Sequence, residues 1–311
     1  MTASARYTDS FGFLPRWIAV EFSRGAIRPL EHFLRRKSAV AKRTNSDGYV
    51  YPPYQHTLQA SMADGKVRRV PRSRRPALLY RLVPSHSLEL HGVSSDRDEV
   101  RRSEAGFVMH FLSLIYGGRY QFFDWWFDGR VQVGEDFEFA SPELERVASC
   151  IDGALQTYAS WSPDRQMIAT NAMYLFGRTA VHERESDRFQ AEYQVADAAW
   201  FLAWSSGKIP GGPNGRKPPH AERLDQLCRV YGLASDPTQV KELVDLRNPL
   251  LHEALWDGGM PGTPRSDTSF HASYWLHRLS QRALLAVLGL RGEYLRSPWW
   301  QMGGWPFDVE G

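Results

Sequence analysis

The strongest constraint on the fold is a series of helical segments that fills the chain after about residue 140. The first segment, "SPELERVASCIDGALQTYA", begins with Ser141 as N-cap and Pro142 at the first helical position, where helices prefer these residue types. Apolar residues then recur at helical spacing in one segment after another. Further helices are predicted at 164–180, 185–206 and 219–232, from near Pro237, and at 268–290.

Residues 1–138 differ, because turn formers and short apolar runs dominate there. We expect a helix over 98–116, and strands in "RPALLYRLVP", in "HSLELHG" and around the Asp-Gly turn of "GGRYQFFDWWFDGRVQVGEDFEF". The sequence thus predicts an α+β protein. A mixed, strand-rich region over 1–138, suited to sensing or recognition, precedes a helical domain over 139–311. The domain ends in a Trp-rich tail, "SPWWQMGGWPF", which we expect to pack on the body or on a second subunit.

Composition sets broad limits on function. The 311 residues carry a net charge of only +3, which argues against a highly basic coat but leaves room for a local basic patch. Cys150 and Cys228 show no zinc or redox spacing, so a reduced, cytoplasmic chain is expected. Pro15, Arg16 and Glu21 interrupt the N-terminal apolar run, so we expect no signal peptide. No apolar stretch is long enough for a membrane span.

The segment 243–257, "LVDLRNPLLHEALWD", interrupts the helical pattern. Val240, Leu243 and Val244 form one apolar face, and the next position on that face is Arg247. A guanidinium cannot stay buried without partners. Arg247 must therefore find a carboxylate, reach solvent or line a cleft.

The two residues that follow Arg247 are Asn248 and Pro249. Because proline disfavours helix in the preceding residue, we expect a break here, with Asn248 capping a new segment that Pro249 starts. Asn248 and His252 are four residues apart and share a helical face. The sequence then predicts that Arg247, Asn248 and His252 converge at a helix N-terminus, where an anionic group binds well.

These residue types suit one reaction in particular. Histidine moves protons near neutral pH, and arginine can hold a phosphate and stabilise charge that builds on it. With the ribose 2′-OH as nucleophile, RNA cleavage needs no metal and no cofactor. The alternative is a capped, kinked helix whose arginine is satisfied without any catalysis.

The stretch "LRNPLLHEAL", late in a helical domain, resembles the HEPN superfamily, whose mark is Arg, four to six residues, then His. Arg247, Asn248 and His252 match the motif of its ribonuclease members, in which Asn often follows Arg. The order of a long helix, a loop, a short helix and then the motif is most similar to the Apea-like branch. The resemblance covers about 140–295, with weaker similarity over 105–135.

This resemblance implies an all-α HEPN-like bundle, and a homodimer in which two motifs face one cleft. It implies a metal-independent endoribonuclease acting in toxicity or anti-phage defence, with an antitoxin or a phage-derived trigger as partner. It also implies an acidic residue on an earlier helix. Asp197 is the first candidate and Glu192 the second, although either can equally be a plain surface carboxylate. A Tyr that some HEPN toxins carry two residues after His is here Ala254. The alternative function is a non-catalytic HEPN module for RNA or partner binding.

A second, weaker candidate for RNA contact lies in the loop-rich N-terminal region. Five arginines cluster within eight residues, and such a cluster is either a solvated loop or a contact to RNA or a partner. These are Arg68, Arg69, Arg72, Arg74 and Arg75.

Overall fold

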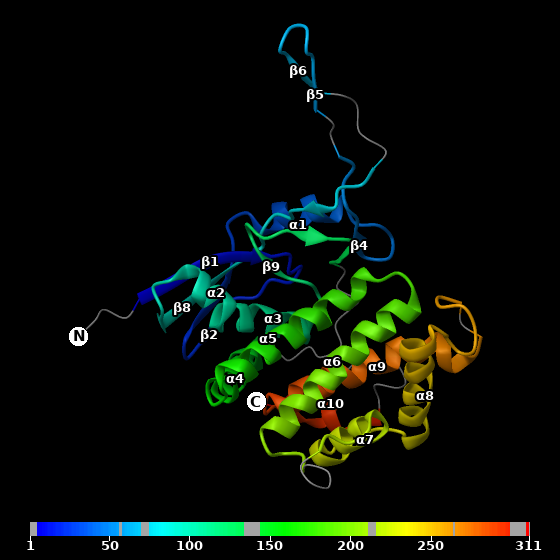
Figure 1. The fold of residues 1–311 in the computed structure, drawn as a ribbon. Coiled ribbons are helices and arrows are strands. Elements are labelled where there is room, and N and C mark those ends of the chain that lie inside the picture. The colour runs from blue at the N-terminus through cyan, green and yellow to red at the C-terminus, as the bar shows by residue number, and fades with distance from the viewer. Residues whose placement is uncertain are drawn as a thin grey trace.

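The structure is a computed structural model that describes residues 5–55, 58–69, 75–133, 144–210, 216–263, 265–298 and 309–310. Within them, the N-terminal part is built around a sheet and the C-terminal part is mostly helical, so the predicted α+β class is confirmed. Figure 1 shows the sheet and its covering helices on one side and the longer helices on the other. No helix among the described residues is long and apolar enough to cross a membrane.

The main sheet has five strands in the order β2-β3-β8-β1-β9, and every neighbouring pair is antiparallel. Its long central strands are β8, which the sequence predicted, and β1, which it did not. The strands are β1 (Ala5–Gly12), β2 (Val20–Phe22), β3 (Gly25–Pro29), β8 (His86–Val93) and β9 (Gln121–Phe122).

The remaining strands form two-stranded pairs. They are β4 (Tyr49–Val50) with β11 (Val131–Gln132), β7 (Leu79–Tyr80) with β10 (Phe127–Asp128), β5 (Leu58–Ala60) with β6 (Val67–Arg69), and β12 (Arg291–Gly292) with β13 (Val309–Glu310). At the predicted Asp-Gly turn the chain bends, and Gly129 has a φ of +59°. However, its flanking strands β10 and β11 pair with β7 and β4 rather than with each other. The segment "RPALLYRLVP" contributes only the two residues of β7.

The predicted C-terminal helices are confirmed within a few residues. They are α4 (Leu144–Ala159), α5 (Pro163–Arg178), α6 (Glu185–Ser205), α7 (His220–Tyr231), α8 (Pro237–Glu253) and α9 (Asp267–Val287). A 3-10 turn, η2 (Thr179–Val181), follows α5, and a short helix, α10 (Glu293–Arg296), follows β12. Ser141 and Pro142, the predicted cap of the first helix, lie outside the described residues, as does most of the Trp-rich tail.

In the N-terminal part, α1 (Phe33–Ala41) was not predicted. The helix expected over 98–116 is two helices, α2 (Arg97–Arg102) and α3 (Glu104–Tyr116), which meet at Ser103. Every residue of α3 from Ala105 to Tyr116 is buried, so this short, mostly apolar helix is covered on all sides. It packs against both β8 and α5 and so joins the sheet to the helices.

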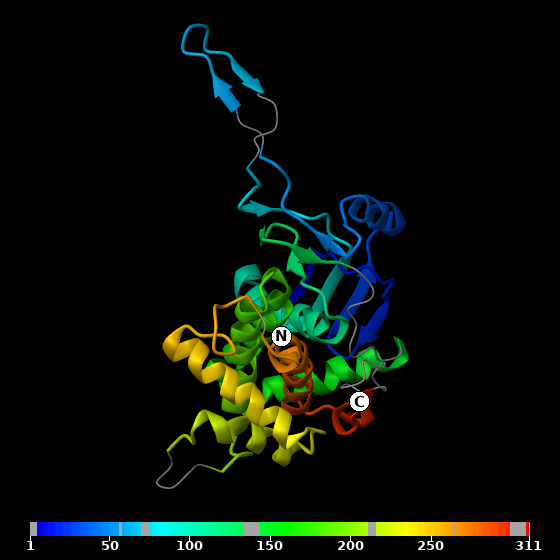
Figure 2. The same ribbon diagram turned by 90° about the vertical axis from the view of Figure 1, so that its right-hand side faces the viewer.

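One hydrophobic core therefore runs through both parts of the chain. It includes Phe11 of the sheet, Phe111 of α3, Trp200 of α6 and Leu284 of α9, all essentially inaccessible to solvent. The proposed boundary at 138/139 falls within 134–143, outside the described residues, and stays a prediction. Figure 2, seen from the side, shows α8 and α7 on the outer edge of the helical part, away from the sheet.

Candidate functional site

Arg247, Asn248 and His252 meet near the end of α8. The Arg247 Nη1 atom lies 3.0 Å from Asn248 Oδ1 and 3.4 Å from His252 Nε2. Asn248 and His252 are exposed, while Arg247 is half-buried. The structure thus brings these three side chains together, as predicted, but near the C-terminal end of α8 rather than at a helix N-terminus.

The predicted helix break at Asn248 is wrong. α8 runs without interruption from Pro237 to Glu253, with Pro249 inside it. The helix tolerates this proline because Val240, Leu243, Val244 and Leu246 hold its other face in the core, which compensates for one lost backbone hydrogen bond. The motif thus lies near a helix C-terminus, whose partial negative charge does not attract anions. Any anion at this position would have to be held by side chains.

The chain fixes the end of α8 just after the motif. Ala254 adopts the left-handed conformation with a φ of +56°, and its N–H and that of Leu255 both donate to the Pro249 carbonyl. Trp256 then turns into the core, where its ring lies 5.0 Å from the Phe189 ring of α6. This anchor fixes the last turn of α8 against α6.

Two residues from other helices hold the far side of the Arg247 guanidinium. Its Nη2 atom lies 3.3 Å from Nε2 of His220, the first residue of α7. Its Cζ atom lies 5.5 Å from the ring centroid of Tyr193 on α6, a cation–π distance. The guanidinium is therefore held in place from three helices.

Asp197 belongs to this cluster, but it reaches Arg247 only through His220. Its carboxylate lies 3.1 Å from His220 Nδ1 and 3.3 Å from Arg223 Nη1. These contacts assign the histidine as an Nδ1–H donor to Asp197 and an Nε2 acceptor from Arg247. The result is a chain of contacts from acid to imidazole to guanidinium, in which Asp197 sets the orientation of His220.

Burial shifts the pKa of two groups in this cluster. Burial lowers the pKa of His220, and the charges of Arg223 and Arg247 lower it further, outweighing the nearby Asp197. The imidazole is therefore neutral at neutral pH, as the acceptor role of its Nε2 requires. Burial and the Asp197 charge raise the pKa of Tyr193, whose hydroxyl has no hydrogen-bond partner among the described residues.

Glu192, the second candidate acid, lies in a different cluster. It is fully buried, and its Oε1 atom is 2.9 Å from Arg188 Nε and 3.0 Å from His277 Nδ1. These partners come from α6 and α9, and they differ from the motif residues and from those that surround Asp197. The geometry therefore favours Asp197 over Glu192 as the acid that supports the motif.

Arg68 and Arg69 of the arginine cluster lie on the β5–β6 hairpin, which Figures 1 and 2 show extending away from the body of the protein. Arg68 and Arg69 belong to β6, and Arg75 is exposed, whereas Arg72 and Arg74 lie outside the described residues. This hairpin does not lie at the motif. Across the described part of the chain, no group of three or more His, Cys, Asp or Glu side chains could hold a metal ion.

Sequence reasoning did not identify His220, Arg223 or Tyr193. His220 is separated from Arg247 by 27 residues and by a complete helix, so no local pattern connects them. The one available signal is "HAER", which places His220 and Arg223 three apart on one face of α7.

Comparison with protein-family models, with curated proteins and with solved structures finds no match for this chain.

Proposed function

We propose that this protein is a metal-independent endoribonuclease of the HEPN type. The observation that carries the proposal is the meeting of Arg247, Asn248 and His252 around one guanidinium, at the exposed end of α8. A second support is the chain from Asp197 through His220, which orients that guanidinium from behind. An arginine that only stabilised α8 would not need a guanidinium oriented by His220 and Asp197 from two other helices.

In the proposed reaction, the ribose 2′-oxygen attacks the adjacent phosphorus while the bond to the 5′-oxygen breaks. One proton leaves the 2′-hydroxyl and another reaches the departing 5′-oxygen, so the products are a 2′,3′-cyclic phosphate and a 5′-hydroxyl. His252 serves as the general base or the general acid. Arg247 stabilises the negative charge on the phosphate oxygens, and Asn248 orients the substrate or His252.

We further propose that the protein acts as a homodimer in toxicity or anti-phage defence, controlled by an antitoxin or a phage-derived trigger. The dimer proposal has one physical support. Leu251, Leu255, Met260 and Phe270 are exposed at 38% or more, and they flank the motif from the end of α8 to the start of α9. Exposed apolar side chains beside a site are typical of protein interfaces.

The test is cleavage of mixed cellular RNA by the purified protein in excess EDTA, followed by analysis of the fragment ends. We expect the wild type to leave cyclic-phosphate ends and His252→Ala to leave the RNA intact. The matched control is His91→Ala, which removes an exposed histidine of β8 and should cleave like the wild type. Equal cleavage by wild type and His252→Ala would show that the proposed mechanism is wrong.

The second candidate is a non-catalytic HEPN module that binds RNA or a partner. The projecting β5–β6 hairpin favours it, because Lys66, Arg68 and Arg69 sit on an element that extends into solvent. Under this function, His252→Ala keeps its biological activity, while substitution of Arg68 and Arg69 by Gln removes it. The two functions therefore make opposite predictions for His252→Ala.

A further inference from the structure

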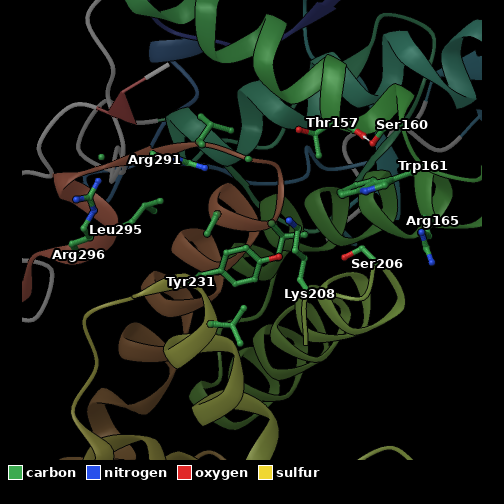
Figure 3. A pocket seen from close by; sticks show the side chains of 16 residues that line it. Thr157, Ser160, Trp161, Arg165, Ser206, Lys208, Tyr231, Arg291, Leu295 and Arg296 are labelled. Carbon is green, nitrogen blue, oxygen red and sulfur yellow. Dashed lines mark hydrogen bonds between the residues drawn. The ribbon is translucent and has the colours of Figure 1, made fainter. Parts of the chain in front are cut away.

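A pocket of about 720 Å³ lies where the ends of α4, α6, α7 and α9 meet, beside β12 and α10. Figure 3 shows its lining, with Arg165 and Trp161 on one side, Arg291 and Arg296 on the other, and Tyr231 and Lys208 between them. No residue of α8 lines it, so it is separate from the candidate catalytic site. Its volume lies in the range of pockets that hold small ligands and cofactors.

The pocket is strongly cationic. Arg165, Lys208, Arg291 and Arg296 line it, and none of its described lining residues is acidic. None of these four side chains forms an ion pair or a hydrogen bond with another described residue. Four like charges around one cavity repel one another, and an anionic ligand relieves that repulsion.

The helix ends around the pocket do not account for these cations. Helix C-termini attract positive charge through their free carbonyl groups. Here backbone N–H groups that follow the helices already cap such carbonyls: Lys208 to Ala203, Leu233 to Cys228, and Leu290 to Leu285. The side-chain donors of the four cations therefore remain available for a ligand.

The uncharged lining adds an aromatic surface and hydroxyl groups. Trp161 and Tyr231 are half-buried, and their rings line one side and the middle of the pocket. Burial raises the pKa of Tyr231 to about 12, so its phenol stays a hydrogen-bond donor at neutral pH. Thr157, Ser160 and Ser206 add hydroxyl groups. A ligand with a flat ring, a polyhydroxylated middle and several negative charges matches this lining.

We infer that this pocket binds a free nucleoside polyphosphate. The phosphates of this ligand contact the Lys208 and Arg296 side chains. Its base packs on the Trp161 ring, where stacking is favourable. The four cations line one pocket of limited volume, about 720 Å³, which favours a small molecule over an RNA strand. This inference concerns a site apart from the motif and does not rest on the proposed nuclease activity.

The test is isothermal titration of the full-length protein with ATP, GTP, adenosine and inorganic tripolyphosphate. We expect ATP or GTP to bind, and both Lys208→Gln and Arg296→Gln to weaken that binding at least tenfold. The matched control is Lys42→Gln, which removes an exposed lysine outside the pocket and should change nothing. His252→Ala should also bind the nucleotide like the wild type, because His252 does not line the pocket. Nucleotide binding is then measured separately from RNA cleavage.

The role of the ring is tested separately with Trp161→Leu. We expect this variant to lose affinity for the nucleotide at least tenfold and to keep its affinity for tripolyphosphate, which also shows that the pocket remains folded. The inference is overturned if neither nucleotide binds, or if Lys42→Gln weakens binding as much as Lys208→Gln. It is also overturned if a single-stranded oligoribonucleotide binds at this site and the free nucleotides do not.

Discussion

Arg247 occupies the position on α8 where the helical pattern calls for an apolar residue, and its contacts explain why an arginine can stand there. One guanidinium nitrogen faces Asn248 and His252, and the other faces His220. A planar fork suits this arrangement because its nitrogens point in fixed, different directions. A lysine, with a single nitrogen, cannot replace it.

Replacement of Arg247 separates the catalytic function from a purely structural one. We expect Arg247→Ala to lower RNA cleavage roughly 100-fold or more, the usual cost of a lost charge-stabilising donor. Its unfolding free energy should fall by only about 1 kcal/mol, because the side chain is half-exposed. Urea unfolding and cleavage assays on the same preparation measure both effects. A loss of about 3–5 kcal/mol would instead mark a buried structural ion pair.

His220 is a positioning residue in this scheme, since it contacts Arg247 and Asp197 rather than the proposed substrate. Its pKa is lowered, so it accepts a proton only at a pH below the usual histidine range. Protonation on Nε2 would place a cation against the Arg247 guanidinium. The cleavage rate should therefore fall at acid pH, and this acid limb of the pH–rate profile should depend on His220.

We expect His220→Gln to lower the cleavage rate about tenfold, a modest loss for a group that acts through another. We also expect it to remove that acid limb from the pH–rate profile. The control is Asp197→Asn, which should lower the rate by a similar factor while keeping a histidine-dependent limb. A His220→Gln profile that matches the wild type at every pH would rule out this positioning role.

At the scale of elements, the helices after residue 140 were predictable because each has several turns of apolar spacing and a recognisable start. Asp236 and Pro237, for example, cap and begin α8 as such residues usually do. The short strands β2 and β3 were not predictable, because three to five residues are too few to show alternation. The helix through Pro249 was mispredicted because the local preference of proline is weaker than the packing of the whole helix.

The candidate site was predictable only in part. The motif residues lie within one turn and a half of α8, so helical geometry brings them together. His220, Tyr193 and Arg223 join them through the packing of α6 and α7 against α8, which no local pattern encodes. Asp197 was identified because it is the single charge in the apolar run "VADAAWFLAW" and needs a partner, although its partners proved to be His220 and Arg223 rather than the motif residues.

Ala254 provides a prediction about how α8 ends. It holds a φ of +56°, a conformation that costs an L-residue with a Cβ about 1 kcal/mol relative to glycine. Ala254→Gly should therefore raise the unfolding free energy by about 0.5–1 kcal/mol in urea and leave cleavage unchanged. Ala254→Val should have the opposite effect on stability, because a β-branched residue fits this region poorly. Destabilisation by glycine would mean that the left-handed C-cap is not formed.

At the scale of the whole molecule, the shared core makes the sheet and the helices depend on one another. Two histidines are buried within this fold, His86 on β8 against Phe11 and Phe33, and His110 on α3 against Tyr174 of α5. Burial lowers the pKa of each to about 3. His86 Nε2 accepts the Ile18 N–H at 3.4 Å, an acceptor role that only the neutral ring can fill.

These histidines predict that the whole fold weakens in mild acid. Because their folded pKa lies below the unfolded value of about 6.5, the unfolded chain takes up protons first. Their contribution is complete above pH 6.5 and falls towards pH 3, by up to about 1.4 kcal/mol per pH unit for each ring. His182, His220 and His277, whose pKa values are also lowered, act in the same direction.

The measurement is the unfolding free energy in urea between pH 7 and pH 5, where most carboxylates remain ionised. We expect stability to fall with pH across this window. The slope of unfolding free energy against pH gives the number of protons taken up on unfolding, and in His86→Gln that number should be smaller by about one. This variant has lost one of the rings that titrate only in the unfolded chain. His91→Gln, which changes an exposed histidine of the same strand, should keep the wild-type slope. A flat profile in the wild type would mean that His86 and His110 take up protons while folded, and hence that water reaches these two rings.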